Sequence, residues 1–91
     1  MMKLRQRSST AEDRAWVCCC WLETLARRLD LPRRSAHAMA NALYPHADVR
    51  VIEAEGEPAV LVGFIAYIEE EPVCRYVSRQ FRDAGVASLL G

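Results

Sequence analysis

The residues best suited to do chemistry lie near the end of the chain, where an apolar stretch gives way to a short polar turn. They follow the pattern Arg-x-x-Gly-x-Ala and comprise Arg82, Asp83, Ala84, Gly85, Val86 and Ala87. Small residues let a backbone approach a ligand closely, and the free N–H groups at a helix N-terminus favour negative charge. The pattern therefore indicates a site for a phosphate or pyrophosphate. Without context, such a pattern is more often a tight turn that begins a helix.

Four cysteines and two histidines are the other residues that could act as ligands or nucleophiles. Cys18–Cys20 are consecutive, so their side chains would point about 100° apart on a helix and cannot form a disulfide framework with one another. Neither His37 nor His46 stands at a metal-ligand spacing from a cysteine. The sequence therefore predicts no metal site, and it predicts that Cys18–Cys20 and Cys74 are small core residues in a reducing compartment.

The polar turn follows a predicted strand, Val73–Ser78, which would hold the site at its end. β-Branched and aromatic residues predict two more strands before it, over Val49–Glu55 and Pro58–Glu69. Gly63 indicates a bulge or a close approach of two backbones. Short turns, of which the second is Glu69–Pro72, would connect these strands into an antiparallel meander.

Two helices are predicted ahead of the meander. Thr10 and Asp13 approximate a capping box, and the helix that they begin is expected to run to about Leu29. The segment Ala15–Leu22 is apolar on all sides for two turns, so we expect it to be buried on more than one side, by the second helix, by a partner or by both. The second helix is predicted over Pro32–Tyr44. Its apolar stripe is expected to contain Ala36, Met39, Ala40 and Leu43.

A short edge strand over Lys3–Arg7 is expected to complete the sheet. The predicted order is then a strand, two helices, three strands and the start of another helix. We therefore expect an α+β fold with two helices packed on an antiparallel sheet of about four strands, in a single domain over residues 1–91.

The formal net charge is zero, which argues against bulk binding to nucleic acid. Residues 1–50 nevertheless carry a net charge of +4 and residues 51–91 a net charge of −4, so an antiparallel dimer could pair unlike halves. Four arginines flank the join between the helices, either as a solvated cluster or as a docking patch for an acidic or phosphate group: Arg27, Arg28, Arg33 and Arg34. Without an apolar run that suits a signal peptide or a membrane span, the sequence predicts a cytoplasmic protein with no membrane partner.

The segment Cys74–Gly91 resembles motif A of the GCN5-related N-acetyltransferases, the GNAT superfamily. Ala59–Ile65 resembles the strand before that motif, with its Val-Gly-Phe step. The segments Ala11–Val17 and Trp21–Leu22 resemble the first helix of GNAT proteins often carried by bacteriophages. The resemblance covers nearly the whole chain in the right order, but a GNAT domain normally continues well beyond this length. We therefore expect a truncated GNAT-like domain over residues 1–91.

The resemblance implies that the loop Arg82–Ala87 binds the pyrophosphate of acetyl-CoA or CoA through its backbone N–H groups. Tyr76 and Val77 would pair with the pantetheine arm, and Arg79 and Arg82 would add positive charge. No catalytic residue is assigned. The only nearby carboxylates are the three in Glu69–Glu71, which are expected to be solvated, and the family's later strand and helix fall beyond residue 91.

Three functions are compatible with these expectations. The favoured one is a GNAT-like protein that acts by binding another protein, such as a host enzyme of acyl-CoA or thioester metabolism, in the host cytoplasm if a phage encodes it. The second is an acetyl-CoA-dependent N-acetyltransferase that is active as a homodimer. The third is an unrelated small α+β interaction domain whose match to the motif is a coincidence.

Overall fold

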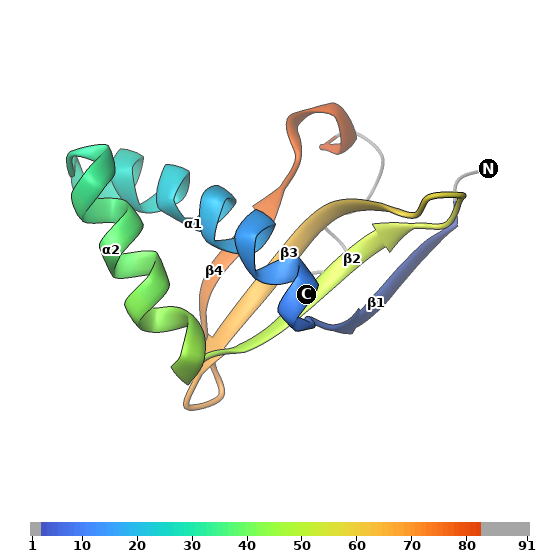
Figure 1. Cartoon of the computed structure of the whole chain (residues 1–91), viewed down its shortest axis with the longest axis horizontal. Helices are drawn as coiled ribbons and strands as arrows, with labels where there is room; N and C mark the ends of the chain where they lie inside the picture. Colours follow the sequence, from blue (N-terminus) through green and yellow to red (C-terminus); the bar gives the residue numbers. More distant parts are fainter. Residues whose placement is uncertain (1–2, 83–91) are drawn as a thin grey trace.

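The described part of the computed structural model, residues 3–82, is built from one antiparallel sheet and two helices that pack on one of its faces (Figure 1). The sheet has the order β1-β2-β3-β4. The elements are β1 (Leu4–Ser8), α1 (Arg14–Leu29), α2 (Arg33–Leu43), β2 (Asp48–Ala54), β3 (Val60–Ile68) and β4 (Glu71–Val77), with short 3-10 helices at Ala11–Asp13, Tyr44–His46 and Arg79–Phe81. The predicted α+β fold is confirmed. No helix within residues 3–82 is long and apolar enough to cross a membrane.

Helix α1 is buried on more than one side, as its continuous apolar run predicts. Val17 and Trp21 are almost fully buried, and Leu22 is buried with them in the same apolar cluster. Ala15 and Cys19 remain exposed. The prediction that all four cysteines lie in the core is therefore wrong for Cys19, because the sheet and α2 together leave one line of the helix uncovered.

Helix α2 packs through small residues, and this narrows its buried stripe. Ala36 and Ala40 are fully buried, whereas Met39, which was expected on the same stripe, is 37% exposed. The helix ends at Leu43, and Pro45 lies within the 3-10 helix that follows. Proline is compatible with this position because the first residues of a helix lack an intrahelical partner for their N–H groups.

The sheet carries apolar side chains on both faces. Val51 and Phe64 belong to the cluster that the helices cover, while Ile52 and Ile65 belong to a second cluster. The pairing between β2 and β3 shifts between Ile52 and Glu53, which leaves Val62 of β3 as an extra residue. This bulge lies next to Gly63, where the sequence predicted a bulge or a close backbone approach.

The β3–β4 hairpin is tighter than predicted. Its turn consists of Glu69 and Glu70, which have φ angles of 51° and 68°, whereas Glu71 and Pro72 already belong to β4. A two-residue hairpin turn of this kind matches the twist of the strands but normally favours Asn and Gly at its positive φ angles. The sequence therefore gave no local signal for so short a turn.

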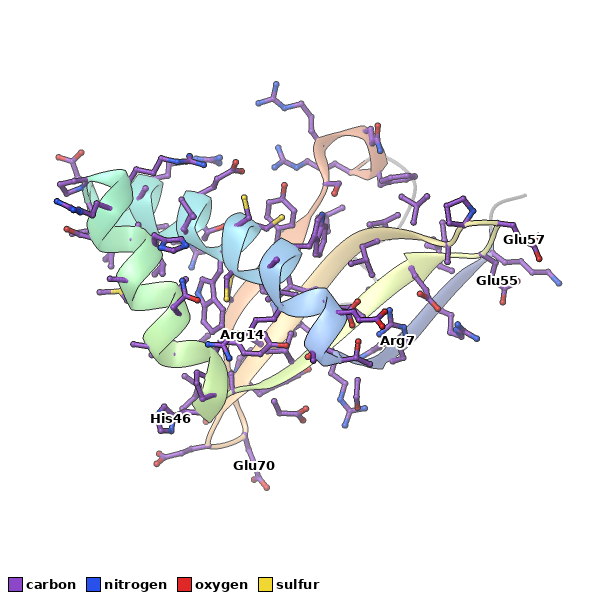
Figure 2. The ribbon with its side chains drawn as sticks, viewed as in Figure 1. Arg7, Arg14, His46, Glu55, Glu57 and Glu70 are labelled. Atoms are coloured by element: carbon purple, nitrogen blue, oxygen red, sulfur yellow. The ribbon has the colours of Figure 1, made fainter. Side chains whose placement is uncertain are left out.

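Arg7 of β1 connects three elements through two buried carboxylates. Its Nη1 donates to Asp13 Oδ2 at 2.7 Å, and its Nε lies 3.2 Å from Glu53 Oε2 of β2. The Thr10 backbone N–H also donates to Asp13 Oδ2, at 2.7 Å, so the predicted capping box is confirmed. Arg5 forms a further ion pair with Glu53. Figure 2 shows Arg7 beside the start of α1 and the neighbouring strands.

These contacts lower the pKa of both carboxyl groups. The hydrogen bonds from Arg7 hold the pKa of Asp13 below its usual value, against the opposing effect of burial. The hydrogen bond from Arg5, together with that from Arg7, lowers the pKa of Glu53 in the same way. Because Asp13 and Glu53 are only 6% and 5% exposed, each needs its cationic partner to remain ionised inside the fold.

We expect Arg7→Met to lower the free energy of unfolding by about 3 kcal/mol, because it leaves two buried carboxylates without their shared partner. Urea denaturation followed by the fluorescence of Trp16 and Trp21 measures this change. Arg5→Met is the matched control: its side chain is 60% exposed, and the loss should stay below about 1 kcal/mol. Equal losses in the two variants would contradict the role given to Arg7.

The same pair of carboxylates predicts that the folded protein loses stability as the solution becomes acidic. Their folded pKa values lie below those of the unfolded chain, so they contribute stability above about pH 4 and lose it as the pH falls through the folded pKa values. Urea denaturation between about pH 6 and pH 3 should show this loss in the wild type. In Arg7→Met the free energy of unfolding should fall less as the pH is lowered, or should rise. The same pH dependence as in the wild type would contradict the assignment.

Candidate functional site

A groove of about 350 Å³ lies beside β4 and the last turns of α1. We call it the β4 groove. Four of its lining residues are arginines, and none is a carboxylate. Two of the arginines come from α1, one comes from β4, and one follows the last described 3-10 helix. The lining residues are Thr24, Arg27, Arg28, Arg75, Tyr76, Val77 and Arg82.

The four arginines give this groove a concentrated positive charge. Within residues 3–82 the ion pairs involve other arginines, namely Arg5, Arg7 and Arg50. Arg82 is held at the end of β4, because its Nε donates to the Val77 carbonyl oxygen at 3.1 Å. Guanidinium groups gathered in one groove raise the local positive potential and favour an anion with several oxygens. The nearby carboxylate of Glu23 acts on Tyr76 of the same groove but does not line it.

Tyr76 is fixed in the groove by aromatic packing. Its ring centroid lies 6.0 Å from that of Trp16 in an edge-to-face arrangement and 5.9 Å from that of Phe64 in a stacked one. Burial is the main cause that raises the pKa of the Tyr76 phenol. The phenol therefore stays protonated at neutral pH, with Cys20 as a neighbouring hydrogen-bond partner.

Gly63 allows β4 to lie where it does. A Cβ atom on Gly63 would stand 2.6 Å from the Tyr76 carbonyl oxygen, closer than real side chains come to a backbone atom. The predicted close approach of two backbones is thus confirmed, and it occurs beside a residue of the β4 groove. Within the described chain, β4 pairs only with β3, so the peptide groups on its other edge can pair with a ligand.

The cysteines near this groove are not nucleophiles at neutral pH. Burial raises the pKa of Cys20 and of Cys74 to about 11, so both remain thiols. The carboxylates of Glu69 and Glu70 lie at the opposite end of β4, at the hairpin tip marked by Glu70 in Figure 2. Residues 3–82 contain no group of three or more His, Cys, Asp or Glu side chains arranged to hold a metal ion.

The structure brings together three of the residues that the sequence assigned to a site, Tyr76, Val77 and Arg82. The other five, residues 83–87, lie outside the described residues. Thr24 and Arg75 were missed, since nothing in the sequence shows which strand α1 crosses. The arginine cluster predicted at the helix join is divided: Arg27 and Arg28 line the β4 groove, whereas Arg33 and Arg34 line a different groove, between α1 and α2.

Comparison with known proteins supports the fold and leaves the chemistry open. No protein-family model and no curated sequence matches the chain. The chain is similar to a structure described as the solution structure of apo-form YjaB from Escherichia coli, with a TM-score of 0.71 and 22% sequence identity. The match covers 98% of this chain and 62% of YjaB. The chain therefore spans less than two-thirds of the length of this structural neighbour.

Gly63→Ala should destabilise the protein by about 1–3 kcal/mol, because the added methyl group must push β4 away at Tyr76. Urea denaturation measures the loss, and the fluorescence of Trp16 reports displacement of the Tyr76 ring. Gly56→Ala is the control, because the nearest atom to its added Cβ is at an ordinary contact distance of 3.5 Å. A Gly63→Ala variant as stable as Gly56→Ala would contradict the close approach.

Proposed function

We propose that this chain binds an acyl-coenzyme A in the β4 groove, as the cofactor-binding part of a GNAT-like N-acetyltransferase. The observation that carries the proposal is the set of four arginines, without a carboxylate, beside the free edge of a strand. The likeness of Cys74–Gly91 to motif A supports the same placement, because Arg82 lies at the end of β4, separated from it along the chain by Ser78 and one 3-10 turn, Arg79–Phe81.

The chemistry of coenzyme A fits the residues that line the groove. Its pyrophosphate and 3′-phosphate match arginine forks, which bind phosphate oxygens in pairs. Arg82 stands at the end of β4 next to the Arg82–Ala87 motif, and Arg27, Arg28 and Arg75 extend the positive charge along the groove. The two amides of the pantetheine arm require donors and acceptors, and the edge of β4 that does not pair with β3 provides both, apart from the Val77 carbonyl, which already accepts from Arg82 Nε.

Bound acyl-CoA would supply a thioester whose acyl group passes to an amine. The protonated Tyr76 phenol suits a hydrogen bond to the thioester or to its departing sulfur, where negative charge develops. No described carboxylate lines the β4 groove, so no residue within 3–82 is proposed as the general base. In the alternative drawn from the sequence in which the chain is an enzyme, the second copy of a homodimer would supply the remaining groups.

A protein-binding role is the second candidate, favoured by one observation. The apolar line of Ala15 and Cys19 on α1 stays exposed beside α2, although this segment is apolar enough to be buried on all sides. The surface that would serve a protein partner is therefore distinct from the β4 groove. A host protein of acyl-CoA metabolism remains the partner that the resemblance to phage GNAT proteins implies.

Isothermal titration calorimetry with CoA and with pantetheine tests the first proposal. We expect CoA to bind and pantetheine, which lacks the phosphates, to bind at least about tenfold more weakly. Arg27→Glu/Arg28→Glu should lower the affinity for CoA by roughly tenfold or more. Gly85→Glu should lower it similarly if the motif loop holds the pyrophosphate.

Arg33→Glu/Arg34→Glu is the matched control, because it makes the same charge change on α2, outside the β4 groove. Its affinity for CoA should stay within about twofold of the wild type, since it loses only long-range attraction that salt screens. Absence of CoA binding at about 1 mM, or equal losses in the two double variants, would contradict the proposal.

A further inference from the structure

A second, larger groove runs between α1 and α2 and contains the exposed Ala15 and Cys19 on which the protein-binding candidate rests. We call it the helix groove. It encloses about 850 Å³. It is lined by Ala11 of the 3-10 helix before α1, by Arg14, Ala15, Cys18, Cys19 and Leu22 of α1, and by Arg33, Arg34, His37 and Asn41 of α2.

The helix groove has an apolar floor and a cationic rim. Small or apolar side chains of α1 form the floor, and Ala15 and Cys19 among them are exposed. Arg14, Arg33 and Arg34 stand on the rim, and none of them joins an ion pair within residues 3–82. None of the lining residues is a carboxylate. A partner that covers this surface must therefore be apolar at its centre and acidic at its margins.

The rim is held in place by local contacts. The Arg14 guanidinium carbon lies 5.0 Å from the centre of the Tyr44 ring, which positions the charge between α1 and the end of α2, as Figure 2 shows for Arg14. Asn41 Nδ2 donates to the backbone carbonyl of His37 at 3.0 Å and contacts its ring at 3.2 Å. The first contact orders Arg14 before any partner arrives, which reduces the entropy lost on binding, and the second orders Asn41 and His37 along α2.

The shape of the groove favours a helix as its occupant. The lining residues of α1 extend from Arg14 to Leu22, which is about 12 Å at the rise of a helix and matches about two turns of a partner. Two packed helices present ridges between which a third helix can insert its own side chains. A bare phosphate would leave the apolar floor uncovered, so a small anion does not account for the surface.

Charge opposes a dimer of this chain in which two helix grooves face each other. If two copies joined in this way, the arginine-rich rim of one groove would face the arginine-rich rim of the other. Like charges brought together in this way oppose association. The helices themselves are basic on this side, so neither α1 nor α2 of a second copy offers the acidic margins that the rim requires.

We propose that the helix groove docks an acidic amphipathic helix of a protein partner, with apolar residues at i, i+4 and i+7 on the floor and Glu or Asp beside Arg14, Arg33 and Arg34. This site is independent of the β4 groove, so it stands whether or not the chain binds coenzyme A. It assigns a recognition role to the exposed face of the helical hairpin.

A designed peptide tests the docking surface. The probe, called the Glu peptide, is a fluorescein-labelled helix of about 18 residues with Leu at i, i+4, i+7 and i+11 and Glu at the flanking positions. The control, called the Lys peptide, has Lys in place of every Glu. Fluorescence anisotropy should show saturable binding of the Glu peptide, at least about tenfold tighter than that of the Lys peptide. Arg33→Glu/Arg34→Glu should lower the affinity for the Glu peptide by about tenfold, and Arg33→Gln/Arg34→Gln should lower it by less.

The opposite double variant separates the two grooves. Arg27→Glu/Arg28→Glu should change the affinity for the Glu peptide by less than about twofold, although it is expected to weaken CoA. Cys19 gives a readout that does not depend on charge. It is the exposed one of the four cysteines, so the Glu peptide should slow its alkylation by iodoacetamide several-fold while Cys18, Cys20 and Cys74 stay unreactive.

Three results would overturn the proposal. The first is no saturation by the Glu peptide up to about 1 mM, and the second is equal binding of the Glu and Lys peptides. The third is self-association in analytical ultracentrifugation that Arg33→Glu/Arg34→Glu abolishes, because the groove would then be an interface between copies of this chain. Circular dichroism of each variant confirms that a lost affinity does not come from a lost fold.

Discussion

The arrangement of this chain depends on one arginine that satisfies two buried carboxylates. Asp13 and Glu53 lie in different elements, and both are removed from water. Ionised carboxyl groups are costly to bury unless a cation meets them with good geometry, and Arg7 reaches both from the edge strand β1. This fixes β1 against β2 at one side of Arg7 and the first turn of α1 at the other. The direction of α1 then decides which of its residues reach β4.

That direction produces two basic surfaces from one helical hairpin. The last turns of α1 contribute Arg27 and Arg28 to the β4 groove, while its earlier turns form the floor of the helix groove opposite Arg33 and Arg34. The two grooves differ in what lies beside their arginines. In the β4 groove it is the edge of a strand, which suits a phosphorylated ligand with amides. In the helix groove it is an apolar floor, which suits a protein helix.

Local patterns in the sequence predicted the helices and strands. Which residues line the two grooves depends on long-range packing, which such patterns do not reveal. The capping box of Thr10 and Asp13, the apolar run of α1 and the bulge beside Gly63 are properties of neighbouring residues, so the sequence reveals them. The exposure of Cys19 depends on the side from which α2 packs, and the place of Arg75 depends on how α1 crosses the sheet. Neither leaves a periodic signal. The motif residues 83–87 lie outside the described residues, so their predicted role stays a prediction.

The free edge of β4 also has a consequence for how the protein behaves at high concentration. An unpaired strand edge is a template on which another chain can add a strand, and such additions lead to sheet aggregates. Arg75 lies within β4, and Val73 beside it is 41% exposed at an irregularity in the pairing with β3. A charged side chain and a local distortion are the two devices by which natural sheets discourage such additions. The arginine that would hold a ligand thus also protects the strand when no ligand is bound, and anything that neutralises it without covering the edge favours precipitation.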